Sequence, residues 1–338
     1  MSERSFIFES KSIGQERRIG NKAGGFTYHI SYNLREGDTI AISHDYVVIK
    51  RYETGKIGLY NATTGSPILA DVYDSIEVKR YSPAGSKYSQ LCNKPITYYE
   101  VSVNGLYGAY SEFGHQKVPI SYCKGITMED GLFIVKNPKT GWYGVYNESG
   151  KEIVPEEFSY VYVRYGLIVT TIKSIIGTMM YVFNEDGKSI FKQQFKDVIK
   201  CFEKIKVSNS IIAIKENGLY TVCNREGKPI YNGVFKSINL YDNYFIAQAE
   251  NGLWGLYAND GKELIPPKLK TMSKFDEKYI RGSTEISEYL FYYNGEAVLS
   301  GGMFKKITKT RYGASATDVA TGKRVRIALD KTSYAVFI

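Results

Sequence analysis

The stretch "NGLWGLYANDGKELIP", residues 251–266, decides how this sequence is interpreted. Two earlier stretches repeat it closely: "NGLYGAYSEFGHQKVP" at 104–119 and "GWYGVYNESGKEIVP" at 141–155. A motif that recurs within one chain is typical of stacked or radially arranged repeats, and not of a single-copy fold. The chain has 338 residues, which is enough for many such copies and a substantial core.

The turn glycine of this motif gives the period of the repeat. Aligning its copies gives Gly65, Gly114, Gly150, Gly187, Gly227, Gly261, Gly295 and Gly322. The intervals are 49, 36, 37, 40, 34, 34 and 27 residues. A unit of this size accommodates about four short strands. The long first interval predicts an insertion near residues 79–95, and the last two units are degenerate.

Within each copy the residues alternate with the period of a strand. In "GLWGLY", Trp254 and Leu256 share one face, and Leu253, Gly255 and Tyr257 share the other. Both faces are apolar, so we expect each strand to be covered on both sides. Glycine is unfavourable inside a strand. Its recurrence in the middle of the second face predicts space for an aromatic ring from a neighbouring sheet.

Turn chemistry separates the strands. "NESG", "NEDG" and "NREG" place Asn before a type I turn and Gly at a left-handed position, which predicts a bulged hairpin. Proline follows in the next strand at Pro119, Pro155 and Pro266. Because proline cannot donate a ladder hydrogen bond, this strand is predicted to lie at a sheet edge.

These features predict an all-β protein, a β-propeller of seven or eight four-stranded blades, with a β-solenoid of stacked hairpins as the alternative. The 30 tyrosines and 32 glycines agree with many strands and tight turns. We divide the chain into an N-terminal segment, 1–37, and a repeat domain, 38–338. In the first of these, "FTYHISYNL" at 26–34 can supply a strand that completes a terminal sheet.

The repeat resembles the WG-repeat family of bacterial proteins. The resemblance covers residues 44–300, with good copies at 104–119, 141–155 and 251–267 and weaker ones at 55–76, 178–199 and 217–238. The WG dipeptide occurs at Trp254–Gly255, and Tyr replaces Trp in the other copies. The resemblance implies a repeat architecture and a role in binding or scaffolding. It implies no set of catalytic residues.

Composition points to a cytoplasmic protein that does not enter membranes. The N-terminus has no apolar signal region, and no run of about 18 apolar residues occurs. Cys92, Cys123, Cys201 and Cys223 are widely spaced, which argues against a disulfide framework. The formal net charge of +9 permits an anionic partner without requiring one.

The sequence contains no recognisable catalytic or cofactor motif. His29, His44 and His115 are not spaced as metal ligands, and no phosphate-binding loop or nucleophile elbow occurs. The acidic residues of the turns are best explained as solvated charges. We therefore expect no enzyme activity, no cofactor and no metal.

Two basic regions stand out as candidate partner-binding sites, because each combines cations with tyrosines or with other cations. The first lies in the predicted insertion and the second near the C-terminus; the candidates are Lys79, Arg80, Tyr81, Lys87, Tyr88, Lys94, Lys323, Arg324 and Arg326. Cations beside tyrosines suit phosphate contact with base stacking, and they equally suit a protein interface. They are also what exposed strand positions look like in a Lys- and Tyr-rich chain. The insertion itself can be a neutral surface loop.

A protein–protein interaction scaffold is the leading functional prediction. It rests on the repeat architecture and on the absence of an assembled catalytic motif. The alternative is an accessory subunit that contacts nucleic acid within a larger ribonucleoprotein or defence complex, an idea that rests on the net charge and the basic clusters.

Overall fold

The structure is a computed structural model that describes residues 6–9, 17–19, 28–30, 34–35, 37–43, 45–82, 95–175, 177–191, 200–311, 313–329 and 334–337. These residues form strands, turns and bends without a helix. No helix in the described part of the chain could therefore span a membrane. The chain divides into two compact units. The first comprises Met1–Ile172 with Asn184–Lys188, and the second comprises Lys173–Phe183 with Ser189–Ile338.

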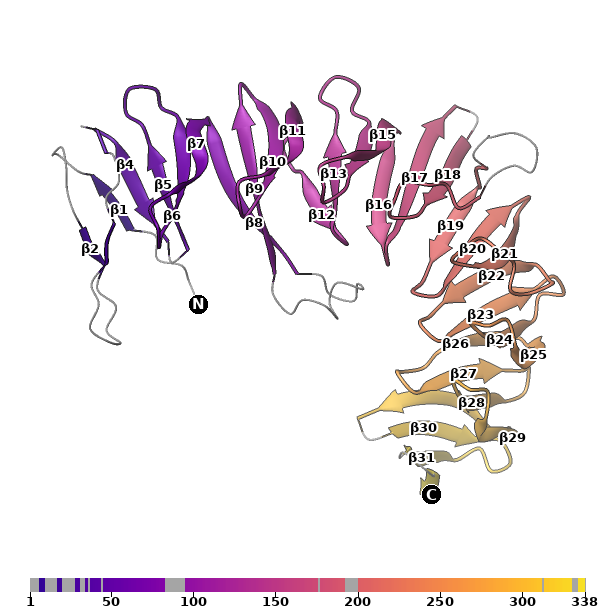
Figure 1. Ribbon diagram of the computed structural model, residues 1–338. Coiled ribbons are helices and arrows are strands. Elements are labelled where there is room, and N and C mark those ends of the chain that lie inside the picture. Colours follow the sequence, from indigo (N-terminus) through magenta and orange to yellow (C-terminus); the bar gives the residue numbers. More distant parts are fainter. Residues whose placement is uncertain are drawn as a thin grey trace. The chain divides into compact units, whose positions relative to one another are not determined.

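The first unit contains one five-stranded and two four-stranded antiparallel sheets (Figure 1). The fifth strand of the first sheet is β1 (Phe6–Glu9). A fourth sheet is divided between the units, because its last strand, β18 (Gly177–Phe183), belongs to the second unit. The first sheet contains β4 (Thr39–Ile42), β5 (Tyr46–Lys50), β6 (Ile57–Asn61) and β7 (Pro67–Tyr73), and the second contains β8 (Ser75–Tyr81), β9 (Ile96–Val103), β10 (Leu106–Ser111) and β11 (Gln116–Tyr122). The third contains β12 (Thr127–Glu129), β13 (Leu132–Lys136), β14 (Tyr143–Tyr146) and β15 (Glu152–Phe158). The fourth contains β16 (Tyr160–Arg164), β17 (Leu167–Ser174) and β18. The boundary between the units falls within this fourth sheet.

In the second unit the strands are hydrogen-bonded into two seven-stranded sheets, β19–β25 and β26–β32. We divide each into two successive repeats, which we call the fifth to eighth sheets. The fifth sheet contains β19 (Lys204–Val207), β20 (Ile211–Glu216) and β21 (Leu219–Asn224), and the sixth contains β22 (Phe235–Leu240), β23 (Tyr244–Ala249), β24 (Trp254–Ala258) and β25 (Glu263–Leu269). The seventh contains β26 (Thr271–Lys274), β27 (Tyr279–Ser283), β28 (Glu288–Tyr292) and β29 (Ala297–Thr310). The eighth continues with β30 (Gly313–Asp318), β31 (Arg324–Leu329) and β32 (Tyr334–Phe337). β29 is long because it ends the seventh sheet and begins the eighth. In the fourth and fifth sheets, single bridges at Phe183–Ser189 and Cys223–Pro229 stand for the fourth strand.

The all-β class and the four-stranded antiparallel blade of the predicted propeller are confirmed. Proline also lies where predicted, because Pro119, Pro155 and Pro266 are on the edge strands β11, β15 and β25. At the N-terminus the prediction differs from the structure. Residues Tyr28–Ile30 form β3 and pair with β2 (Arg17–Ile19), whereas the strand beside the first sheet is β1 (Phe6–Glu9), which pairs with β4.

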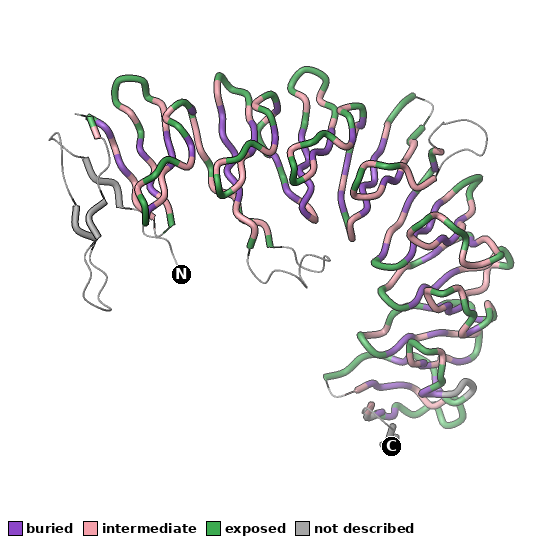
Figure 2. Tube along the Cα trace, viewed as in Figure 1, coloured by how far each residue is buried: buried purple, intermediate pink, exposed green. Residues whose placement is uncertain are grey.

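Successive sheets within a unit pack face to face, as their two apolar faces require. Tyr98 and Val118 of the second sheet share a core with Met128 and Phe133 of the third. Corresponding cores join the first sheet to the second and link the fifth, sixth, seventh and eighth sheets in turn. Figure 2 shows the resulting pattern, in which buried residues follow the strands and exposed residues gather in the turns.

The glycine inside each motif strand has a different cause from the predicted one. A Cβ on Gly144 would lie 3.0 Å from the carbonyl oxygen of Val154, and one on Gly255 would lie 2.8 Å from that of Ile265. Both carbonyls belong to the adjacent edge strand of the same sheet, where the register shifts at a bulge. The space is therefore filled from within the same sheet, by this backbone together with the side chains of Glu156 and Tyr257, and not by an aromatic ring from a neighbouring sheet.

The turn glycines adopt the predicted left-handed conformation. Gly150 has a φ of 85°, and its N–H donates to the carbonyl of Asn147 at 3.0 Å. The Asn147 side chain accepts from the N–H groups of Ser149 and Lys151, at 3.1 and 2.9 Å. A bulged turn of this kind needs glycine because other side chains clash at positive φ.

Gly322 does not belong with the other seven glycines. It lies between β30 and β31, the second and third strands of the last sheet, whereas Gly65 to Gly295 lie between third and fourth strands. Its hydrogen bond to Asp318, at 3.0 Å, matches that of Gly141 to Asn137 in the third sheet, at 2.9 Å. This explains the short final interval of the sequence alignment.

Each sheet has two distinct ends. At the glycine-turn end, the first strand turns into the second and the third turns into the fourth. At the link end, the second strand turns into the third and the chain passes to the next sheet. These links are short, a single residue at Asp74, Ser159 and Lys270, so within a unit the link ends of consecutive sheets lie side by side.

Candidate functional site

The predicted insertion is smaller than the sequence suggested. Lys79, Arg80 and Tyr81 are not in a loop, because they end β8 and pair with Tyr98, Thr97 and Ile96 of β9. The predictions for Lys87, Tyr88 and Lys94 lie outside the described residues. Alternation within the strand gives each of the three described residues its own environment.

Tyr81 has a structural role in the described chain. Its ring packs against the core between the second and third sheets, and burial raises the pKa of its hydroxyl. The hydroxyl accepts the N–H of Asp130 at 2.9 Å, and the Asp130 carboxylate accepts the N–H of Gly166 at 2.9 Å. Lys79 forms an ion pair with Glu77 at 2.6 Å. Of the three, Arg80 is exposed, at the glycine-turn end of the second sheet.

The second predicted cluster lies on the last sheet of the other unit. Lys323 ends the turn before β31, while Arg324 and Arg326 alternate along β31 with the buried residues Val325 and Ile327. The two arginines therefore share the polar face of this sheet. The Arg324 guanidinium donates to the Ser315 hydroxyl at 3.0 Å. The three residues lie next to one another, on β31 and the turn before it.

Sequence reasoning missed the most distinctive surface of the first unit. Large apolar side chains are strongly exposed there, and five of the six lie at the link end: Tyr52, Val72, Leu106, Trp142 and Tyr160. The sixth, Phe113, lies at the glycine-turn end. The second unit shows the same preference among its described residues, with Ile175, Ile286, Met303 and Val319 at the link end and Tyr293 at the other.

Four aromatic residues lie at the link end of the third and fourth sheets; we call Trp142, Tyr143, Tyr160 and Tyr162 the aromatic edge. The three tyrosines are joined by ring contacts, and Trp142 is the exposed residue before Tyr143 in the chain. Trp142 is 46% exposed and Tyr160 is 52% exposed. The Tyr160 ring contacts those of Tyr143 and Tyr162, with centroids 6.3 Å apart in both pairs. Burial raises the pKa of Tyr162, which forms the inner part of the cluster. A signal was present in the sequence, because Trp142 is a tryptophan at a position where other copies carry leucine.

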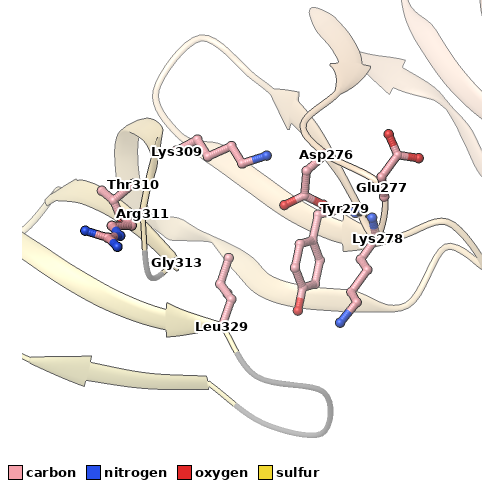
Figure 3. A pocket seen from close by; sticks show the side chains of 9 residues that line it. All are labelled: Asp276, Glu277, Lys278, Tyr279, Lys309, Thr310, Arg311, Gly313 and Leu329. Carbon is pink, nitrogen blue, oxygen red and sulfur yellow. Dashed lines mark hydrogen bonds between the residues drawn. The ribbon is translucent and has the colours of Figure 1, made fainter. Parts of the chain in front are cut away.

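The second unit contains a cavity of about 500 Å³ at the glycine-turn end of its last two sheets (Figure 3). One wall is the turn between β26 and β27, and the other is the end of β29 with the start of β30. The lining residues are Asp276, Glu277, Lys278, Tyr279, Lys309, Thr310, Arg311, Gly313 and Leu329. Neither predicted cluster contributes a residue to it.

Metal-binding chemistry is not assembled in the described part of the chain, where no group of three His, Cys, Asp or Glu residues could hold an ion. Cys123, Cys201 and Cys223 are free thiols there. Burial raises the pKa of Cys223 to about 11, so its thiol stays protonated at neutral pH.

Comparison with known proteins leaves the family of this chain unassigned. No protein-family model matches it, and no curated protein does. Among solved structures, similar chains include the computationally designed Ika8 protein (12% identity, TM-score 0.29, 84% of this chain and 93% of that one), AztD from Citrobacter koseri (10%, 0.29, 82% and 90%) and the WD40 β-propeller domain of Doa1 (11%, 0.24, 84% and 86%). At such TM-scores the likeness supports no argument about function.

Proposed function

We propose that this protein is a non-enzymatic, cytoplasmic protein–protein interaction scaffold that binds its partner through the link end of the first unit. One observation carries the proposal: exposed large apolar side chains concentrate at that end, and the aromatic edge lies on the last two of its sheets. Tyrosine and tryptophan are enriched among the residues that dominate binding energy at protein interfaces. The scaffold role is the one predicted from the sequence, but the proposed binding site is now the aromatic edge instead of the two basic regions.

The chemistry of the aromatic edge suits a protein partner. Its edge-on and tilted rings present a broad apolar surface that loses little side-chain entropy when it is covered. Lys136 lies over the ring of Tyr143, with its ammonium 5.4 Å from the centroid. Lys139 is exposed in the neighbouring turn. A partner with an apolar centre and acidic residues around it would be complementary to this surface.

A capture experiment with matched variants tests the proposal. The wild-type protein, a Trp142→Ser/Tyr160→Ser double variant and a Phe113→Ser control would each be used to isolate partners from the native cell. Phe113 is 74% exposed in the same unit but lies at the other end. We expect one protein to bind the wild type and the control, and to bind the double variant at least about tenfold more weakly.

Thermal melting checks that the double variant is folded. Both altered side chains are about half exposed and Tyr160 loses two ring contacts, so we expect a loss of about 1–3 kcal/mol in the free energy of unfolding and a single cooperative transition. Equal partner binding by all three proteins would refute the aromatic edge as the site. Recovery of no protein partner by the wild type would refute the scaffold itself.

A further inference from the structure

The positive charge of the chain resides in its second unit. The first unit contains 20 Lys and Arg residues and 20 Asp and Glu residues, whereas the second contains 24 and 15. The formal net charge of +9 therefore belongs to the second unit alone. A charge excess confined to one part of a chain is typical of a surface that binds an anionic partner.

The first strands of the sheets in the second unit concentrate this charge. They are β19, β22, β26 and residues 305–310 of β29, which begin four successive sheets (Figure 1) and are described throughout. Together they carry no acidic residue and seven lysines, which are Lys204, Lys206, Lys236, Lys274, Lys305, Lys306 and Lys309. The first strands of the other unit, β4, β8, β12 and β16, carry three basic and two acidic residues. The excess is therefore a property of one strand position in one unit.

A lysine lies at the link end of each of these four strands; we call Lys204, Lys236, Lys270, Lys305 and Lys306 the lysine row. All five are exposed. Each follows, by one or two residues, a buried side chain that pairs with the preceding sheet: Phe202, Phe235, Leu269 or Phe304. Because sheets that pack face to face are about 10 Å apart, the row extends over about 30 Å. The corresponding positions of the first unit carry Asp74, Cys123 and Ser159.

Acidic residues at the same end of the sheets leave most of this charge uncompensated. Glu285 pairs with Lys270 at 3.5 Å, but both side chains are strongly exposed, and such a pair is weak. Glu203 accepts the N–H of Gly218 at 3.1 Å, and Glu250 lies in the turn between β23 and β24. Within the described part of the chain, the other four lysines of the row form no ion pair. Their ammonium groups are therefore available to an anion.

The exposed residues of the first strands suit phosphate better than they suit a protein. Apart from lysine they are Asn239, Thr271, Ser273, Thr308 and Thr310. Lysine, serine, threonine and asparagine side chains commonly donate hydrogen bonds to the phosphates of nucleic acids. Protein interfaces are instead enriched in aromatic residues, Met and Arg, and are depleted of Lys and Ser. Exposed apolar residues of this end, such as Ile286 and Met303, lie outside the first strands.

We propose that the lysine row binds the phosphate backbone of a nucleic-acid duplex. Its length of about 30 Å is close to one turn of B-DNA, about 34 Å. No aromatic ring is exposed in the four described first strands, so base stacking would not contribute and we expect no sequence preference. Contact with nucleic acid was the alternative prediction from the sequence, but it rested on two other basic regions. The site is independent of the aromatic edge, which belongs to the other unit.

Fluorescence anisotropy of the full chain tests the proposal, with two DNA duplexes of unrelated sequence and one RNA duplex as probes, from about 50 to about 200 mM salt. The variant is Lys204→Ser/Lys236→Ser/Lys305→Ser. The matched control removes the same charge from exposed lysines at the glycine-turn end of the same unit, as Lys228→Ser/Lys262→Ser/Lys278→Ser.

We expect the wild type and the control to bind all three duplexes, and both DNA sequences equally well. The variant should bind at least about tenfold more weakly at low salt, because three phosphate contacts are lost. On DNA, its plot of log affinity against log salt concentration should be shallower by about three, one for each lysine removed. Lys204→Arg/Lys236→Arg/Lys305→Arg keeps the charge and should bind like the wild type.

Other outcomes would overturn the proposal. Failure of the wild type to bind any duplex at low salt would remove the site, and an equal loss in the glycine-turn control would remove its location. Weak binding by the arginine variant would show that the lysines act through the fold and not through charge. Binding to vesicles of anionic lipid, without binding to a duplex, would replace nucleic acid with a membrane surface.

Discussion

The two ends of the repeated sheets differ in how tightly they are packed. At the glycine-turn end, a Cβ on Gly114 would lie 2.1 Å from the carbonyl oxygen of Ile68, and one on Gly261 would lie 1.9 Å from that of Ile230. Both contacts are with the preceding sheet. At the link end, Gly105 and Gly252 have no atom within 4 Å of the same position. The glycine turns therefore lie in close contact with the backbone of the preceding sheet, whereas Gly105 and Gly252 at the link end do not.

We expect the largest difference in the free energy of unfolding when glycine is replaced by alanine at one end or at the other. Gly261 and Gly252 lie in the same sheet region with φ values of 91° and 84°, so both variants carry similar backbone strain. Gly252→Ala should cost about 1 kcal/mol from that strain alone. Gly261→Ala must also displace the turn from Ile230, so we expect a total loss of at least about 3 kcal/mol. Denaturant unfolding of both variants measures the gap, and equal losses would contradict the close contact between sheets.

Within the strand, overpacking should give a smaller loss. Gly255→Val places a side chain against the carbonyl of Ile265, so we expect a destabilisation of about 1–3 kcal/mol. Lys268→Val in the neighbouring edge strand is the control, because Lys268 is exposed. Its free energy of unfolding should stay close to that of the wild type. Similar melting of Gly255→Val and the control would show that the edge strand yields easily at the bulge.

In the first sheet, ion pairs connect the strands at the link end. The Arg51 guanidinium forms ion pairs with Asp38 at 2.8 Å and with Asp71 at 2.6 Å, and it donates to the Tyr60 hydroxyl at 3.1 Å. Asp38 is only 2% exposed. Burial opposes its ionisation, but the N–H groups of Arg35 and Tyr52 together with Arg51 outweigh that effect and lower the pKa of its carboxyl.

Asp38→Asn should therefore show a pH-dependent loss of stability. The pKa of Asp38 is lower in the folded state than in the unfolded state, where it is near 3.8. The ionised carboxylate therefore stabilises the folded protein at pH values above 3.8, and this contribution is lost as the pH falls through the pKa of the folded state. At pH 7 we expect the substitution to cost on the order of 1.5 kcal/mol, the value of a hydrogen bond to a charged group. Melting curves from pH 7 to pH 3 should converge for the variant and the wild type. A constant difference would show that Asp38 acts through shape and not through charge.

Particular residues show how much of the structure local sequence patterns could predict. The alternation around Trp254 predicted a strand buried on both faces, and the Asn147–Gly150 turn predicted a bulged hairpin; both are confirmed. These features depend on short stretches of chain, whose conformational preferences act locally. Gly322 was misaligned because turns between different strand pairs use the same residues. Lys79 to Tyr81 were assigned to a loop because an insertion in sequence does not show how far its flanking strands extend.

The class of the fold, the size of the repeat, the edge strands and the left-handed turns could all be inferred from sequence patterns, because each follows from the preferences of neighbouring residues. The reason why Gly255 and Gly261 are glycines emerged from the folded chain, since the carbonyls that they approach lie in another strand or another sheet. The folded chain also decided where exposed rings gather. Trp142 and Tyr160 are separated by two strands, β14 and β15, and the course of the chain through these strands brings them to the same end. The preferences of neighbouring residues determine the strands and turns, whereas the packing of strands and sheets against one another determines the surfaces and cavities.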